Sequence, residues 1–190
     1  MKAYLRKVGI YTSSIIIFFI SMIGILAIGG GRINTSASIP IGLYWITKAP
    51  MKIGDYVLFC PPQKPIFQEA LRRGYISSGF CPGRFGYLMK RVFAKYGDIV
   101  SINSQGVTVN NHYVAHSRPY SQDAQGLPLP LNHLHQYQLK YSELLLMTDQ
   151  SDLSFDARYF GFIDKSQIKA VLIPVITMQS TQINISRSPL

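Results

Sequence analysis

The sequence predicts a mainly β protein, in which a small antiparallel β domain follows one N-terminal transmembrane helix. Two patterns point to this fold class. A charge-free apolar run of membrane length occupies residues 9–31, and much of the remaining chain consists of short β-branched or alternating segments separated by turn residues. The length of 190 residues leaves room for one anchor and one compact domain with its own core.

The apolar run is long enough to cross a bilayer. Residues 9–31 read GIYTSSIIIFFISMIGILAIGGG, without a single charged side chain. At a helical rise of about 1.5 Å per residue, such a run spans a hydrocarbon core about 30 Å thick. The alternative is a cleaved signal peptide, because Thr35-Ser36-Ala37 offers small residues for a processing enzyme, although the run exceeds the usual length of a signal-peptide core.

The charges on either side of the apolar run predict its orientation. Lys2, Arg6 and Lys7 precede it, whereas only Arg32 follows closely. Basic residues favour the cytoplasmic side of a bacterial membrane. We therefore expect a single-pass protein of the inner membrane, with residues 1–8 in the cytoplasm and the folded part, residues 32–190, in the periplasm.

The formal net charge of +10 allows two kinds of partner. A strongly basic chain is attracted to nucleic acids and to anionic lipid headgroups. The basic residues here are scattered, and none of the motifs that organise them on a nucleic-acid groove is present. Together with the apolar run, this favours the membrane and predicts no nucleic-acid partner.

The two cysteines predict a disulfide bond. Cys60 and Cys81 are the only pair, and an even pair in a domain outside the cytoplasm is typically oxidised. The bond would close an insertion over 60–81, in which Pro65–Gly74 has a helical pattern with Ile66, Ala70 and Leu71 on one face. Two reduced, buried cysteines are the alternative, and a metal site is disfavoured because no ligand histidines lie nearby.

The remaining pattern is mostly strand. The expected strands are Gly54–Phe59, Gly97–Ile102, Val107–Val109, Tyr141–Thr148 and Ile168–Thr177. Turn residues separate them at Asn103–Gly106 and at Asn110-Asn111. The segment from Pro119 to His135 is rich in proline, glycine and polar residues, and we expect it to form a surface loop.

Ser38 and Lys90 suggest a catalytic pair. A serine hydroxyl becomes a good nucleophile only when a base takes its proton, and a lysine amine can do so only when burial keeps it neutral. Apolar neighbours surround Lys90, and strand alternation would place it on the face opposite Met89 and Arg91. Pro40 stiffens the chain beside Ser38. Taken singly, each residue is more often a solvated lysine or an ordinary linker serine.

Three blocks in order resemble a known family. They are residues 38–44 (SIPIGLY), residues 89–92 (MKRV) followed by Gly97-Asp98, and residues 154–161 (SFDARYFG). This arrangement is similar to that of type I signal peptidases. The Gly-Leu-Tyr extension and the pair of Cys-Pro sequences look more closely like the conjugative-transfer branch called TraF, whose members mature pilin subunits. The resemblance extends from the apolar run to about Pro174.

The resemblance implies a role for each matching residue. Ser38 would be the acylated nucleophile, Lys90 its general base, and Ser36 with the Ser38 amide an oxyanion hole. Ser154 would hydrogen-bond the lysine. Asp156 with Arg158 would form one ion pair, and Asp149 with Arg91 a second. In the TraF branch the aspartate that matches Asp156 is also implicated in activity, although a purely structural ion pair explains that residue equally well.

The chain departs from the family pattern at two places beside the lysine. Thr148-Asp149-Gln150 stands where signal peptidases have Gly-Asp-Asn, and Ala157 stands where they have a serine before the arginine. Both changes leave the serine and the lysine intact. They put in doubt how the backbone of a substrate docks beside Lys90.

The histidines offer weaker alternatives. His133 and His135 have the spacing of a metal-binding pair, but they lie in the expected loop without an acidic or cysteine ligand, so we expect neither a metal nor another cofactor. A Ser-His-Asp triad built on Ser38 remains possible by spacing, because triads assemble in space. The matching blocks contain no histidine, which favours the lysine.

These observations predict a membrane-anchored serine endopeptidase that processes exported precursor proteins. The resemblance implies a pilin subunit of a conjugative or type IV secretion apparatus as the substrate. After cleavage, either water releases a linear product or the N-terminal amine of the substrate gives a cyclic one. A general signal peptidase is the first alternative. The second is a catalytically inactive pilus assembly factor that uses the same fold.

Overall fold

The structure is a computed structural model that describes residues 2–178, with side chains described from residue 9 onward. The helices are α1 (Lys2–Ile28), α2 (Pro65–Arg72) and α3 (Ala157–Phe160). The strands are β1 (Gly31–Asn34), β2 (Ile41–Thr47), β3 (Tyr56–Phe59), β4 (Ser78–Cys81), β5 (Leu88–Ala94), β6 (Ile99–Asn103), β7 (Gly106–Val109), β8 (His112–Tyr113), β9 (Leu134–Gln138), β10 (Glu143–Met147), β11 (Ile163–Asp164) and β12 (Ile168–Met178). The last residues of the predicted exported part, 179–190, lie outside the described range.

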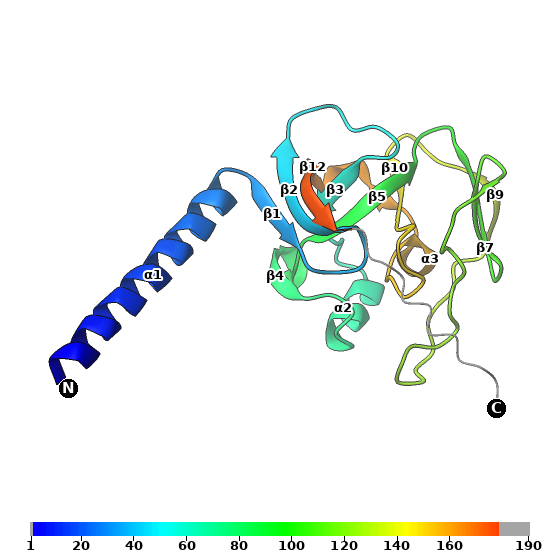
Figure 1. Cartoon of the computed structure of the whole chain (residues 1–190). Helices are drawn as coiled ribbons and strands as arrows, with labels where there is room; N and C mark the ends of the chain where they lie inside the picture. Colours follow the sequence, from blue (N-terminus) through cyan, green and yellow to red (C-terminus); the bar gives the residue numbers. More distant parts are fainter. Residues whose placement is uncertain (1, 179–190) are drawn as a thin grey trace.

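Two antiparallel sheets form the folded domain, which confirms the predicted fold class. One has seven strands in the order β1-β2-β12-β3-β5-β10-β11, and the other has four in the order β8-β7-β6-β9. Figure 1 shows the smaller sheet at the end of the domain opposite to α1. Strand β5 lies inside the larger sheet, between β3 and β10, so its inward side chains are shielded by neighbours on both sides.

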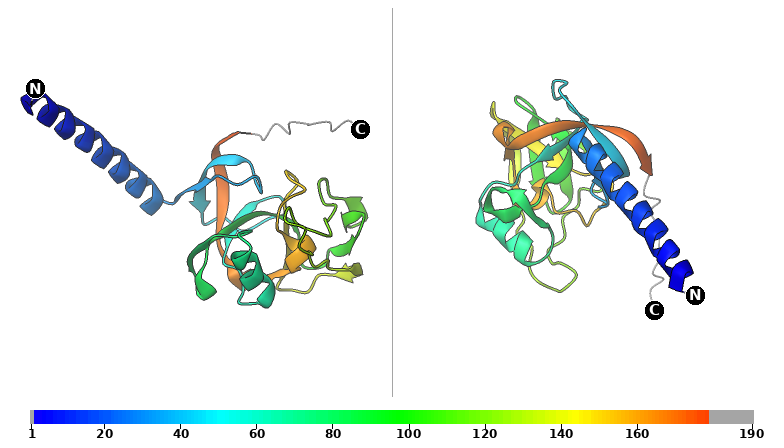
Figure 2. Two further views of the ribbon diagram at one scale, coloured as in Figure 1. Left: turned by 90° about the horizontal axis from the view of Figure 1, so that it is seen from below. Right: turned by 90° about the vertical axis from the view of Figure 1, so that its left-hand side faces the viewer.

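Helix α1 projects away from the domain as an isolated rod (Figures 1 and 2). Its apolar part, Gly9–Ile28, is long enough to cross a membrane, has a mean hydropathy of 2.2 and buries nothing against the rest of the protein. These properties fit either a membrane anchor or a signal sequence. The helix also includes residues 2–8, which the sequence analysis treated as a separate N-terminal segment.

The helix is shorter than the apolar run of residues 9–31. The helix ends at Ile28, and Gly31 is already the first residue of β1, where it pairs with Trp45. Gly30 has a φ of 104°, a left-handed conformation that glycine adopts without steric cost. Two glycines therefore separate the helix from the first strand, and the sheet begins almost directly at the end of the apolar segment.

A disulfide joins Cys60 to Cys81 and closes the predicted insertion, which contains α2. Pro65 begins the helix, where its missing N–H costs nothing. The predicted apolar face is only partly correct, because Phe67 is the most buried side chain of the helix, with Ala70 beside it. Ile66 and Leu71 pack against the core from partly buried positions.

Phe67 fixes the insertion against the rest of the domain. Its ring packs against those of Phe85, Phe155 and Phe160, with centroid separations of 6.2, 6.0 and 5.1 Å. Two of these partners lie in the segment that also carries Ser154 and Asp156. The insertion is thus packed against one of the three sequence blocks that suggested a catalytic site.

Removal of the disulfide should destabilise the domain. The bond joins cysteines that are 21 positions apart in the sequence. Without it the unfolded chain gains conformational entropy, which favours unfolding by about 3 kcal/mol. We expect the Cys60→Ser/Cys81→Ser double variant to lose about this amount in free energy of unfolding, measured by denaturant titration of the full chain in detergent.

Reduction of the wild-type chain provides the matched control for the disulfide. A reductant should lower its stability to that of the double variant and leave the double variant unchanged. Equal stability of the oxidised and reduced wild type would show that the bond does not constrain the domain.

Candidate active site

The buried side chain of Asn34 holds the loop that carries Ser38. Asn34, at the end of β1, is 5% exposed, and its Nδ2 donates to the carbonyl oxygens of Ser36, Ile39 and Pro40 at 2.8, 2.9 and 3.2 Å. Its Oδ1 accepts from the backbone N–H and the hydroxyl of Ser36 at 3.1 and 2.8 Å. One buried amide therefore fixes the chain on both sides of Ser38.

Lys90 occupies a buried position on β5. Partly buried and fully buried residues alternate from Met89 to Ala94, and Lys90, which pairs with Val57 of β3, is only 3% exposed. Arg91 points to the other face, where its guanidinium lies 2.5 Å from a carboxylate oxygen of Asp149. The alternation predicted from the sequence is therefore confirmed, and it places the Arg91–Asp149 ion pair on the face opposite the lysine.

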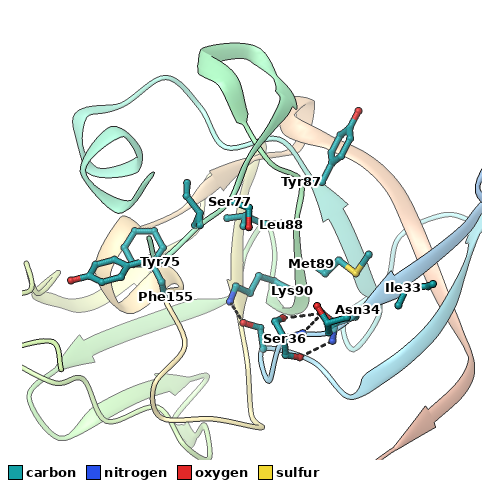
Figure 3. Close-up of a pocket in the computed structure, with 13 residues that line it drawn as sticks. Ile33, Asn34, Ser36, Tyr75, Ser77, Tyr87, Leu88, Met89, Lys90 and Phe155 are labelled. Atoms are coloured by element: carbon teal, nitrogen blue, oxygen red, sulfur yellow. Dashed lines mark hydrogen bonds between the residues drawn. The ribbon is translucent and has the colours of Figure 1, made fainter. Parts of the chain in front are cut away.

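The structure brings Ser38, Lys90 and Ser154 into mutual contact. The Lys90 Nζ lies 2.8 Å from the Ser38 Oγ and 2.5 Å from the Ser154 Oγ, and the two hydroxyl oxygens are 3.1 Å apart. These residues come from a loop, a central strand and a second loop far apart in sequence. Figure 3 shows the Lys90 side chain extending toward the loop that also holds Asn34 and Ser36.

The amine of Lys90 has no carboxylate partner. Among the side chains that the structure describes, it forms no salt bridge, and both hydrogen-bonding neighbours are neutral hydroxyls. Burial lowers the pKa of Lys90 from 10.5 to about 8, because the charged form loses its hydration. Asp156 opposes this shift, and Arg158 adds to it. A substantial fraction of the amine is therefore neutral near physiological pH.

Arg158 and Asp156 hold the segment that positions Ser154. Both side chains are fully buried, with the Arg158 Nε 2.8 Å from an Asp156 carboxylate oxygen and Nη2 2.9 Å from the other. The guanidinium also donates to the carbonyl oxygens of Ser154, Asp152 and Arg118 at 2.9 to 3.1 Å. A buried guanidinium needs an acceptor for each of its N–H groups. The loop that carries Ser154 supplies several of these acceptors, and these bonds hold it in place.

A cavity of about 250 Å³ opens beside the Ser38–Lys90 contact. Ser36, Ser38 and Lys90 all line this cavity. Apolar side chains such as Ile33, Leu88 and Met89 form much of the remaining wall. In Figure 3, Ile33 and Asn34 lie at one end, and Tyr75 and Phe155 at the other. The cavity thus combines the polar groups of Ser36, Ser38 and Lys90 with apolar side chains, and a pocket of this kind can bind a peptide.

The histidines lie away from this cavity. None of its described lining residues is a histidine. His116 contacts Asp152 at 3.2 Å on the surface, and within residues 9–178 no three His, Cys, Asp or Glu side chains gather in a way that could hold a metal ion. The geometry therefore gives Ser38 a lysine as its nearest base.

Two features of the site could not be read from the sequence motifs. Asn34 lies outside the three matching blocks, although a polar residue four positions before a candidate nucleophile is a weak signal. Phe155 lies inside a block but was assigned no role, and it forms one end of the cavity.

Comparison with known proteins identifies the family. The profile described as "Signal peptidase, peptidase S26" matches residues 2–176. The chain belongs to this signal peptidase family. Two relatives from Escherichia coli, both called plasmid transfer protein TraF, are 50% identical over 154 residues and 53% identical over 148 residues. These alignments cover 81% and 78% of this chain and 87% and 83% of the relatives.

A more distant relative agrees with this assignment. The conjugal transfer protein TraF of Agrobacterium fabrum is 35% identical over 152 residues, which are 79% of this chain and 84% of that protein. A solved signal peptidase I from Enterococcus faecalis aligns with 66% of this chain and 98% of its own, at 16% identity and a TM-score of 0.36. The TraF-type resemblance expected from the sequence is thus confirmed by the family profile and the TraF relatives.

The buried amine of Lys90 should reduce the stability of the fold. The lowered pKa means that the unfolded chain binds more protons than the folded chain between about pH 8 and 10.5. The cost of burying the amine, about 3 kcal/mol at order of magnitude, is therefore fully present below pH 8 and disappears as the pH rises through 10.5. We expect Lys90→Met to be more stable than wild type at pH 7 by about 1 to 3 kcal/mol, since lost hydrogen bonds offset part of the gain.

Unfolding of the full chain in detergent at pH 7 and pH 10.5, followed by fluorescence of the single tryptophan, Trp45, measures this difference. The advantage of Lys90→Met should shrink at the higher pH. Lys52→Met, at an exposed position, is the control and should differ little from wild type at either pH. A Lys90→Met protein that is less stable at pH 7 would contradict the expected cost of burial.

Proposed function

We propose that this protein is a membrane-anchored serine endopeptidase with Ser38 as nucleophile and Lys90 as general base. The observation that carries this proposal is the 2.8 Å contact between the Ser38 hydroxyl and a buried lysine amine whose pKa lies near 8. A neutral amine at that distance can accept the hydroxyl proton directly. Membership of a peptidase family supports the same reaction class.

The geometry supports an acyl-enzyme route. As the Ser38 Oγ attacks the scissile carbonyl carbon, its proton passes to the neutral Lys90 Nζ, and the carbonyl oxygen becomes an oxyanion. The lysine ammonium then donates this proton to the leaving amine as the carbon–nitrogen bond breaks, which leaves an ester on Ser38. A second nucleophile, either water or an amine, resolves the ester with Lys90 again acting as the base. Ser154 keeps the amine aimed at Ser38 throughout.

The oxyanion hole in this proposal consists of the Ser38 N–H and the Ser36 hydroxyl. Both groups belong to the loop that Asn34 holds, and Ser36 and Ser38 line the same cavity. In the resting structure the Ser36 hydroxyl donates to the Asn34 Oδ1 at 2.8 Å. The Ser36 hydroxyl must therefore leave this bond before it can donate to an oxyanion. A donor of this kind contributes about 3 kcal/mol to transition-state stabilisation in related chemistry.

The proposed substrate is a pilin precursor of a conjugative or type IV secretion apparatus. The relatives are plasmid and conjugal transfer proteins, which favours a dedicated role in that process. The apolar part of α1 would anchor the enzyme in the inner membrane, with residues 1–8 in the cytoplasm and the catalytic domain in the periplasm. Substrates would then be met in or near the same membrane.

Two other functions lead to different results. A general signal peptidase would rescue growth of a strain that lacks its own, whereas a dedicated enzyme would not. A non-catalytic assembly factor would bind precursors and leave them uncleaved.

The intact mass of the mature product also separates two outcomes of the proposed reaction, because a cyclic pilin is lighter than the linear product by one water.

Substitution of either member of the pair should remove cleavage. We expect Ser38→Ala and Lys90→Ala to lower kcat by about 10⁴-fold or more, because the two residues act as a unit. Lys90→Arg should fail as well, since a guanidinium keeps its proton at ordinary pH. Conversion of precursor by the purified full chain in detergent, followed by mass spectrometry, measures the loss.

Matched controls are available at exposed positions. Ser104→Ala and Lys52→Ala remove the same groups from surface sites and should retain wild-type cleavage. Near-normal processing by Lys90→Ala would eliminate the mechanism, whatever the effect at Ser38.

The pH dependence of cleavage should follow Lys90. The base is active only when neutral, so kcat/KM should rise about tenfold per pH unit below pH 8 and level off above it. Single-turnover rates between pH 6 and 10 measure this profile. A midpoint near 6.5 would instead indicate a histidine base.

A further inference from the structure

A second, larger cavity adjoins the proposed catalytic cavity. Its volume is about 440 Å³, within the range of about 300 to 1,000 Å³ that is common for ligand pockets. Tyr75 and Phe155 line both cavities, so they form a shared wall. Phe155 directly follows Ser154, the residue that contacts Lys90. The larger cavity therefore lies one residue away from the proposed catalytic machinery.

The larger cavity is lined mainly by aromatic and aliphatic side chains, and we call it the aromatic cavity. Its apolar wall consists of Tyr75, Tyr120, Leu129, Leu153, Phe155 and Tyr159. The rings of Phe155 and Tyr159 stack with an interplanar angle of 3°, and Tyr75 packs against Phe155 at 5.7 Å. Leu153, at the rim of the cavity, is 82% exposed.

The walls of this aromatic cavity are held in place before any ligand arrives. The loop of residues 118–130 forms one side, and its Tyr120 N–H donates to the Tyr159 hydroxyl at 3.0 Å. The disulfide-closed insertion forms the other side, where the Tyr75 hydroxyl bonds Asp123 and Arg73 donates to the Pro128 carbonyl at 3.0 Å. Because the site is preformed, a ligand loses no binding free energy to the ordering of these loops.

The position of the aromatic cavity beside the catalytic cavity indicates which ligand it binds. Ile33, close to the end of α1, marks one end of the catalytic cavity, and Tyr75 with Phe155 marks the other (Figure 3). A peptide that crosses the site from the α1 side leaves it past these two rings and meets the aromatic cavity next. In Figure 1 the loop of residues 118–130 lies on the side of α2 away from α1.

We propose that the aromatic cavity is a substrate subsite that binds a large apolar or aromatic side chain of the precursor protein, a few residues from the scissile bond. This inference rests on the proposed function. It also assigns a role to the insertion, which supplies Tyr75 and, through Arg73, secures the opposite loop. Burial of one such side chain is worth about a tenfold or greater change in binding.

Two variants test the subsite by different means. Ala124→Trp fills the cavity from its exposed rim, and Leu153→Ser removes an exposed part of its apolar wall. Each should raise KM for the pilin precursor about tenfold and change kcat less than twofold, because neither touches Ser38 or Lys90. Ser104→Trp adds the same bulk at an exposed turn and should leave both constants unchanged.

The substrate provides the complementary test. Serine substitution at each apolar precursor residue near the cleavage site should identify one position where KM rises about tenfold with the wild-type enzyme. The same change should have no further effect with Ala124→Trp, since the two substitutions remove one interaction. Unchanged KM values for Ala124→Trp, or additive effects throughout the scan, would overturn the subsite.

Precursor binding to enzymes that carry Ser38→Ala separates this proposal from the proposed function. Fluorescence anisotropy of a labelled precursor should show about tenfold weaker binding when Ala124→Trp is added to Ser38→Ala. If wild type fails to cleave but this difference in binding persists, the peptidase activity is wrong and the binding site stands. If wild type cleaves and the two variants bind equally, the subsite is wrong and the peptidase stands.

Discussion

The arrangement of the site depends on one constraint: a lysine amine buried in the larger sheet, with no carboxylate partner among the side chains of residues 9–178. A charged amine in such a place loses its hydration and gains little in return, so its pKa falls to about 8. Two serine hydroxyls satisfy the amine and orient it. The same burial that reduces stability produces a neutral base, so the cost to the fold and the proposed reactivity have a common origin.

A contrasting buried cation lies close by. Arg158 is also shielded from water, but it is paired with Asp156 and surrounded by carbonyl oxygens, so its charge is fully satisfied. The difference follows from chemistry. A guanidinium keeps its proton and can only be structural here, whereas an ammonium that lacks a counter-charge can give its proton up. The hydrogen bonds of Arg158 thus hold the loop around Ser154. The Ser154 hydroxyl in turn orients the Lys90 amine.

Local pattern predicted much of this site. The alternation along 88–94 indicated that Lys90 faces inward, and the cysteine pair indicated the closed insertion; both are observed. The residues that sequence reasoning missed act through contacts distant in sequence or through hydrogen bonds without a motif. Phe67 is buried because rings from other segments meet it, and Asn34 matters because the chain returns past it at Ile39. The end of the helix at Ile28 could not be read from the sequence, because a run of glycines is compatible with both a helix and a turn.

The closeness of α1 to Ser38 limits how far the proposed enzyme can reach. Helix α1 ends at Ile28, and Ser38 follows ten residues later. Even a fully extended chain of that length spans no more than about 35 Å. With α1 in the bilayer, the nucleophile stays within a shallow layer above the membrane surface. A precursor is therefore within range only while its cleavage site remains in this layer, so the time of cutting is tied to the passage of the substrate out of the membrane.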